Sequence, residues 1–231
     1  MKAKGLWFLI AIPALLPAAA PAQTMNLQKV LEQINVSSSK FRNVQADISV
    51  DLYTAVVQEH EQQNGMTAFR RQGSSMEMVT HLNSASGQPV AQLLYRNGEL
   101  DYYQPPPVSQ ESIFSGGANR GEWDSLLATG FGATANDLTS QWTIAFAGME
   151  TIDGHPTAKL DLVSKQASFR NNFSKLTVWI DLSRDISLKQ IFVQPDGDSR
   201  TVTYSHIRYN THLPDSLFAL HLAKGTQVVH R

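Results

Sequence analysis

From about Val44 onward, apolar and polar side chains alternate along most of the chain, and turn signals interrupt the alternation at short intervals. Alternation of this kind places the apolar residues of a β-strand on one of its faces. Helix-length segments do not separate most of these strands, and a parallel sheet would need such crossovers. The pattern therefore predicts a mainly β domain built on an antiparallel sheet or barrel with one apolar face.

Two predicted hairpins indicate which side chains share that face. Asn97-Gly98 suits a type I′ turn, which pairs Tyr95 with Leu100 and Leu93 with Tyr102. A second turn at Asp153-Gly154 joins two further alternating strands, and another strand follows them. The apolar face is predicted to carry Leu93, Tyr95, Leu100, Tyr102, Trp142, Ile144, Phe146, Leu160, Leu162, Leu176, Val178 and Ile180.

Two segments have helical spacing instead. Residues 27–34 carry apolar side chains on one helical face, and Asn26 can cap the helix that they predict. Trp123, Leu126 and Leu127 have the same spacing, with glycines on both sides and Phe131 shortly after. This second segment allows two interpretations: a helix that fills the end of a barrel as core, or a movable lid over a cavity.

The first residues have the features of a secretory signal. Two lysines precede an uncharged stretch, and small residues at Ala20-Pro21-Ala22 suit signal peptidase. A membrane anchor is the alternative, but Pro13 interrupts the apolar run and a spanning helix needs about 20 apolar residues. We expect cleavage of residues 1–22, which leaves residues 23–231 as a single domain outside the cytoplasm.

Composition and motifs favour binding over catalysis. The chain has no cysteine, which excludes thiolate metal sites, a cysteine nucleophile and a lipid anchor on an N-terminal cysteine. Its formal charge is −1 and no basic run exceeds Arg70-Arg71, so we expect no nucleic-acid partner. The histidines lack metal-ligand spacing, and the Ser-x-x-Lys string at residues 37–40 lacks the motifs that accompany it in enzymes. We expect no catalytic residue, no metal and no cofactor.

Several segments resemble a known family in their order and spacing. They are residues 39–47, the hairpin 94–99 with Tyr103-Gln104-Pro105, residues 176–181, residues 190–192 and the tail 213–218. These segments are similar to those of the periplasmic outer-membrane lipoprotein carriers, the LolA-like proteins. The resemblance implies an incomplete, strongly curved antiparallel β-barrel, a half-barrel of about eleven strands. It also implies an N-terminal helix and short lid helices over an apolar cavity that receives acyl chains.

The resemblance implies a function as well. It indicates a soluble, monomeric periplasmic carrier that takes acylated lipoproteins from an inner-membrane lipoprotein-releasing transporter to an outer-membrane lipoprotein receptor. The missing cysteine argues against the anchored receptor itself. Two alternatives remain: a lipid- or stress-sensing half-barrel that regulates an envelope-stress partner, and a carrier of another amphiphile such as a glycolipid. An unrecognised lipid hydrolase is the enzymatic alternative.

Site residues also follow from the resemblance. The apolar-face residues given above, together with Phe69, become candidates for the cavity wall. Trp123, Leu126, Leu127 and Phe131 become candidates for the lid. In LolA-like proteins an arginine near the end of an early strand is thought to hold the lid closed. Arg71 matches that position better than Arg70, but Gln72 stands where the family often has proline, so Arg70 and two merely solvated charges remain alternatives.

Overall fold

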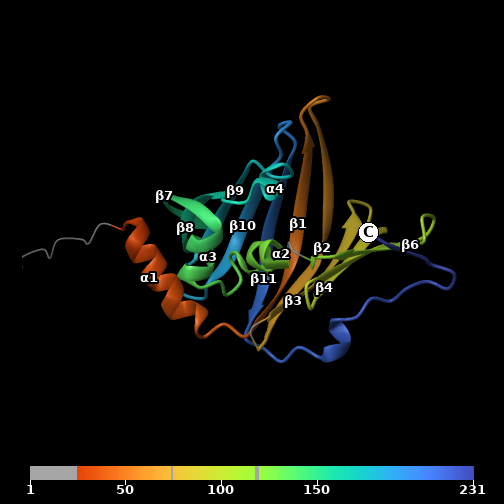
Figure 1. The fold of residues 1–231 in the computed structure, drawn as a ribbon, viewed down its shortest axis with the longest axis horizontal. Helices are drawn as coiled ribbons and strands as arrows, with labels where there is room; N and C mark the ends of the chain where they lie inside the picture. The colour runs from red at the N-terminus through yellow and green to blue at the C-terminus, as the bar shows by residue number, and fades with distance from the viewer. Residues whose placement is uncertain (1–24, 74, 118–119) are drawn as a thin grey trace, which may run out of the picture.

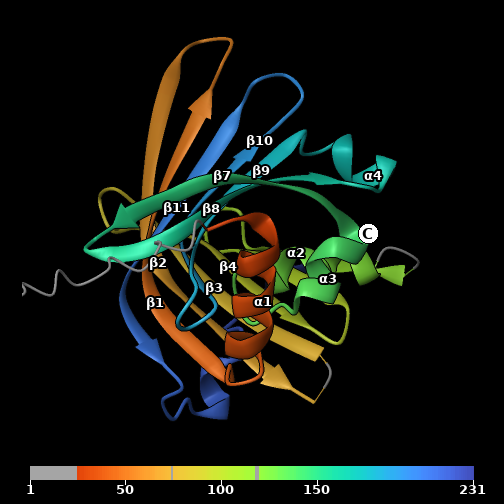
Figure 2. The same ribbon diagram turned by 90° about the vertical axis from the view of Figure 1, so that its left-hand side faces the viewer.

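The fold is described from a computed structural model (Figures 1 and 2). The structure describes residues 25–73, 75–117 and 120–231. The predicted signal peptide, residues 1–22, lies outside the described residues. Within the described ranges, no helix has both the length and the apolar character that crossing a bilayer requires.

The described chain is mainly β, as its alternating pattern predicts. Its helices are α1 (Leu27–Ser38), α2 (Arg120–Ala128), α3 (Ala135–Gln141), α4 (Ala167–Arg170) and a 3₁₀ turn at Asp215–Leu217. Its strands are β1 (Asn43–Thr54), β2 (Glu59–Gln72), β3 (Ser75–Ser84), β4 (Pro89–Arg96), β5 (Glu99–Gln104), β6 (Gln110–Ser115), β7 (Trp142–Ile152), β8 (His155–Ser164), β9 (Lys175–Asp181), β10 (Ile186–Val193), β11 (Ser199–Tyr209) and β12 (Gln227–His230).

These strands form one sheet in the order β12-β6-β5-β4-β3-β2-β1-β11-β10-β9-β8-β7. The sheet curves strongly and stays open between its two edge strands, which confirms the predicted half-barrel (Figure 2). Neighbouring strands run antiparallel except β12, which runs parallel to β6. The sequence analysis did not predict β12, a four-residue strand that covers the backbone edge of β6.

The first hairpin has the predicted register. Asn97 and Gly98 both have positive φ, at 57° and 83°, as a type I′ turn requires. Tyr95 pairs with Leu100, and Leu93 pairs with Tyr102. These four side chains therefore share the concave face of the sheet.

The second hairpin reaches the predicted face only through a β-bulge. Ile152 pairs with His155 at the turn, but the register shifts between Phe146 and Gly148. The shift places Phe146 opposite Leu160, whereas an unbroken ladder would place it opposite Asp161. The apolar side chains of β7 and β8 lie on one face because of this extra residue.

Helix α1 forms where the sequence predicts it. The side chain of Asn26 caps it by accepting a hydrogen bond from the backbone N–H of Lys29 at 3.0 Å. Val30 and Ile34, one turn apart, are fully buried. Their burial places the apolar face of the helix against the β8–β9 half of the sheet, where Leu160 and Val178 belong to the same buried cluster.

The C-terminal segment covers part of the convex face. Phe218 is buried in a cluster with Ala68, Val79 and Leu94, which lie on β2, β3 and β4. Figure 1 shows this segment in dark blue, running beneath the sheet before the chain returns to β6 as β12. The apolar residues on the outside of β2–β4 are therefore shielded by the chain itself.

The close approach of β2 to β3 at Gly65 gives a first testable prediction. A Cβ atom on Gly65 would lie 1.9 Å from the backbone carbonyl oxygen of His81. Gly65→Ala should therefore lower the free energy of unfolding in urea by about 1–3 kcal/mol, because backbone atoms must shift. Gln62→Ala, at an exposed position of β2, is the matched control and should change it by less than about 0.5 kcal/mol. Equal effects of the two substitutions would contradict the prediction.

Candidate functional site

An apolar cavity of about 310 Å³ lies between the concave face of the sheet and the segment that contains α2. Ile48 and Val50 of β1 form part of its wall. Trp123, Leu126 and Leu127 of α2 cover it from the other side. The volume is at the lower end of the roughly 300–1,000 Å³ that ligand pockets occupy. The cavity and the segment over it, residues 123–132 and called the cover below, are the candidate functional site.

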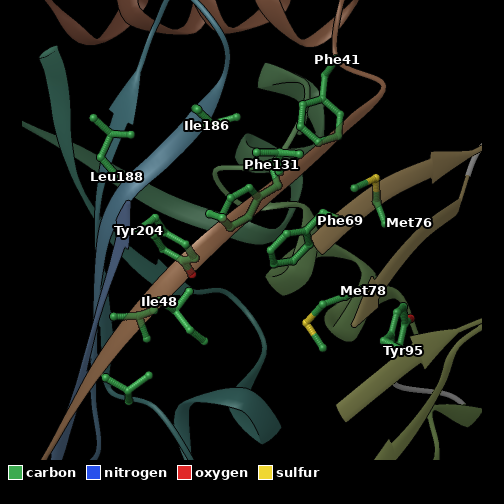
Figure 3. Close-up of a cluster of buried hydrophobic side chains, with 14 residues drawn as sticks. Phe41, Ile48, Phe69, Met76, Met78, Tyr95, Phe131, Ile186, Leu188 and Tyr204 are labelled. Carbon is green, nitrogen blue, oxygen red and sulfur yellow. The ribbon is translucent and has the colours of Figure 1, made fainter. Parts of the chain in front are cut away.

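An aromatic cluster closes one end of the cavity. Phe131 stacks on Phe69 with 3.9 Å between ring centroids, and it packs edge-to-face with Tyr204 with 5.1 Å between centroids (Figure 3). The Tyr204 hydroxyl donates to the side-chain oxygen of Gln190 at 2.8 Å, and the Gln190 amide donates to the carbonyl of Thr129 at 3.0 Å. Complete burial raises the pKa of Tyr204, so its phenol stays protonated and keeps this link between sheet and cover.

Further hydrogen bonds hold the cover against the sheet. The Tyr95 hydroxyl donates to the carboxylate of Asp124 at 2.6 Å. The indole N–H of Trp142 donates to the hydroxyl of Ser125 at 3.0 Å. Both acceptors lie on α2, so Tyr95 of β4 and Trp142 of β7 donate hydrogen bonds to the same helix. The helix is thus fixed by a small set of polar contacts around an apolar underside.

Glycines let the end of the cover approach the sheet closely. Gly130 and Gly132 have φ of 79° and 82°, in the left-handed region. A Cβ at Gly132 would lie 2.5 Å from the ring of Phe41, and one at Gly130 would lie 2.6 Å from the Cβ of Ser187. Close contact and backbone conformation therefore both require glycine at these two positions.

The two candidate arginines face opposite sides of the sheet. Arg71 donates a hydrogen bond from its guanidinium to the carbonyl of Gly132, at the end of the cover. Arg70 pairs instead with Glu77 at 2.7 Å and with Asp215, and lies 4.1 Å above the ring of Phe218. Successive residues of a strand point to opposite faces, which explains the separation. The structure places Arg71 at the cover and Arg70 at the C-terminal segment.

A buried carboxylate lies beside this contact. Asp185, in the turn between β9 and β10, is 1% exposed, and its backbone carbonyl accepts from the N–H of Gly132 at 3.2 Å. Its carboxylate oxygens have no hydrogen-bond partner among the described residues. Burial raises the pKa of Asp185 well above its ordinary value of 3.8, and the nearby charge of Arg71 opposes the rise. The end of the cover therefore contacts Asp185, an acid whose environment favours the neutral form.

Some of the predicted wall residues lie at the cavity. Phe69, Leu93 and Leu100 line it, as do all the lid candidates: Trp123, Leu126, Leu127 and Phe131. Tyr95 is buried next to them and reaches the cover through its hydroxyl. Tyr102 is half-buried on the same face and lies toward Arg200 across the concave side. Of the predicted residues on β2, β4 and β5, three thus line the cavity, and Tyr95 and Tyr102 lie on the same face without lining it.

The remaining candidates lie in a separate, filled core and not at the cavity. They are Trp142, Ile144, Phe146, Leu160, Leu162, Leu176, Val178 and Ile180. Val30 and Ile34 of α1 and Leu138 of α3 pack into the same cluster. These helices fill the concave face over β7–β9, so side chains with the predicted orientation have no open space above them. Alternation identified their face but not what covers it.

Sequence reasoning also missed part of the wall. The additional wall residues are Ile48, Val50, Gln63, Thr67, Met78, Thr80, Leu82, Phe173, Gln190, Phe192, Arg200, Val202 and Tyr204. Ile48 and Val50 carry the same alternation signal as the predicted strands and could have been found. Gln190 and Arg200 are polar, and hydrophobic periodicity gives no signal for such positions. Their location follows from pairing between strands distant in the chain.

Comparison with known proteins identifies a shared fold. No family model and no curated protein matches the sequence. An uncharacterised conserved protein from Thermus thermophilus is 14% identical, with a TM-score of 0.52 over 88% of this chain and 98% of that chain. A candidate outer membrane lipoprotein-sorting protein domain from Vibrio parahaemolyticus is 15% identical, with a TM-score of 0.45 over 84% and 97%. A LolA superfamily protein from Nitrosomonas europaea is 15% identical, with a TM-score of 0.41 over 85% and 99%.

The buried acid gives a prediction about stability and pH. Because the pKa of Asp185 is raised, the native state holds a proton that the unfolded chain releases above pH 3.8. At low pH the acid is protonated in both states and does not destabilise the fold. As the pH rises from 3.8 through the raised pKa, the free energy of unfolding decreases. Asp185→Asn should therefore raise the free energy of unfolding near neutral pH, with a gain that shrinks toward about pH 4.

Urea unfolding at several pH values measures this difference. Asp153→Asn, at an exposed hairpin position, is the matched control and should give a small difference that does not vary with pH. A pH-independent effect of Asp185→Asn would contradict the assigned environment of this carboxylate.

Proposed function

We propose that this chain is a periplasmic carrier of lipoproteins. Its cavity would shelter acyl chains received from an inner-membrane lipoprotein-releasing transporter and deliver them to an outer-membrane receptor. The observation that carries the proposal is the apolar cavity between the half-barrel and the apolar side of α2. The sequence resemblance to LolA-like proteins supports the same function, cargo and compartment.

The proposed cargo explains why a cavity is needed. Moving a buried CH₂ group into water costs about 0.8 kcal/mol, so an acyl chain of about 14 methylenes resists crossing water by roughly 11 kcal/mol. A carrier that covers the chain with its own apolar residues removes most of this barrier. The proposal contains no catalytic step, because sheltering and release require binding alone.

Release requires that the closed, empty form compete with the loaded form. In the closed form Phe131 occupies apolar space against Phe69 and Tyr204, and polar contacts hold α2 in place. An incoming acyl chain would have to displace some of these contacts. The free energy of closure then weakens the apparent affinity for cargo. An acceptor can therefore remove the cargo more easily.

The direct test is to identify and exchange the ligand. The protein is purified from cells without detergent, extracted with organic solvent and examined by mass spectrometry. We expect acylated peptides or lipoproteins among the extracted molecules and exchange with an added acylated lipopeptide. A protein that carries no acyl compound and binds none when supplied would contradict the proposal. Glycolipid alone in the extract would favour the other amphiphile carrier.

Arg71→Leu tests the role proposed for the contact with Gly132. Loss of this hydrogen bond should favour the open form, so the variant should retain an acylated lipopeptide more strongly and transfer less of it to an acceptor. One hydrogen bond to a charged donor contributes about 1.5–3 kcal/mol, which corresponds to a change of about tenfold or more in the ratio of closed to open form.

Transfer to acceptor protein or membranes is measured with a fluorescent lipopeptide. Arg42→Leu removes an exposed arginine next to β1 and is the matched control, which should transfer cargo as the unaltered protein does. If Arg71→Leu also retains and releases cargo normally, the proposed role of Arg71 is wrong.

A further inference from the structure

Arg200 is a cation in the wall of an otherwise mostly apolar cavity. It lies on β11 opposite Leu52 of β1 and Phe192 of β10, and its side chain lines the cavity. Tyr204, four residues further along β11, shares this face and lies at the aromatic end. At about 3.3 Å per residue, roughly 13 Å of strand separates the two. Arg200 is therefore at one end of the wall and the aromatic cluster at the other.

No acidic side chain among the described residues pairs with Arg200. The group that interacts with it across the concave face is the phenol of Tyr102 on β5. Glu61 of β2 pairs with Leu52, the residue that pairs with Arg200 on the other side of β1. The Glu61 carboxylate, however, accepts from the side-chain amide of Gln63 at 2.8 Å. By contrast, Arg184 pairs with Asp181 at 2.7 Å. Arg200 thus presents hydrogen-bond donors on the cavity side without a resident anion.

Arg200 is exposed to solvent, and its side chain also lines the cavity. Neighbouring groups partly desolvate the guanidinium, which lowers the pKa of Arg200, although the side chain as a whole is exposed and water reaches its charge. An exposed guanidinium without an acidic partner can exchange its water for the anionic group of a ligand bound in the cavity. A guanidinium offers two parallel N–H donors that match the oxygens of a carboxylate or a phosphate.

We propose that Arg200 binds the anionic group of an amphiphile whose hydrocarbon chain lies in the cavity. The chain would run from Arg200 toward Phe69 and Phe131, beneath α2. The shared chemistry of the headgroup is a carboxylate or phosphate oxygen pair, and Gln63, which also lines the cavity near this end, is a further polar contact. This inference rests on the proposed carrier function and specifies which cargo the same cavity prefers.

Paired ligands that share one hydrocarbon chain, one anionic and one a neutral ester, test the proposal. Dodecanoic acid and methyl dodecanoate are titrated into the purified protein, with Trp123 in the cavity wall as a fluorescent reporter. The unaltered protein should bind the acid at least about tenfold more tightly than the ester. Arg200→Gln should lose this preference, with unchanged affinity for the ester.

Arg208→Gln is the matched control. Arg208 lies on the same strand, is exposed and pairs with Gln45, which places it on the convex face. This variant should keep the full preference for the acid. Dodecyl phosphate and inorganic phosphate separate the possible sources of the anion: we expect the first to compete with dodecanoic acid and the second not to compete at the same concentration.

The outcomes separate this inference from the carrier function. Equal binding of acid and ester by the unaltered protein, or an unchanged preference in Arg200→Gln, would overturn the headgroup site and leave the carrier function standing. Binding of neither ligand would contradict the carrier function itself. Competition by inorganic phosphate as strong as that of dodecyl phosphate would overturn the assignment to an amphiphile.

Discussion

The concave face of this sheet is apolar, and an open curved sheet cannot bury that face against itself. Over β7–β9 the face is filled, because α1 and α3 insert Val30, Ile34 and Leu138 into it. Over β1–β5 it is covered by α2, whose side chains leave a cavity of about 310 Å³. The same physical requirement, removal of apolar surface from water, thus produces a solid core in one half and a candidate binding site in the other.

The cover is held by interactions of modest size. A typical hydrogen bond contributes about 0.5–1.5 kcal/mol net, and those of Arg71, Tyr95 and Trp142 to the cover would together amount to a few kcal/mol. Burial of each CH₂ group contributes about 0.8 kcal/mol. A hydrocarbon chain of a few methylenes can therefore offset the polar contacts that it displaces. This balance suits a cavity that must both accept and surrender its ligand.

Charges are distributed differently inside and outside the half-barrel. On the convex face Arg70 lies between Glu77 and Asp215 and stabilises the C-terminal segment. On the concave face the carboxylate of Asp185 is buried without a hydrogen-bond partner among the described residues, and Arg200 faces the cavity without a resident acid there. Asp185 lies where the cover ends, whereas Arg200 lies at the opposite end of the cavity wall. The buried acid and the cation without an acidic partner thus lie where cover and ligand would meet the sheet.

Local sequence determined the helix capped by Asn26, the Asn97-Gly98 hairpin and the apolar face of most strands, because these depend on residues close together in the chain. It did not determine what covers that face. Leu93 and Leu160 have the same alternation signal, yet Leu93 lines the cavity and Leu160 lies in the filled core. Only tertiary structure decided this, and it likewise placed Arg71 against Gly132 and Arg200 across from Tyr102. Those contacts join strands and helices distant in sequence, and no periodicity within one segment encodes the partner that folding brings opposite it.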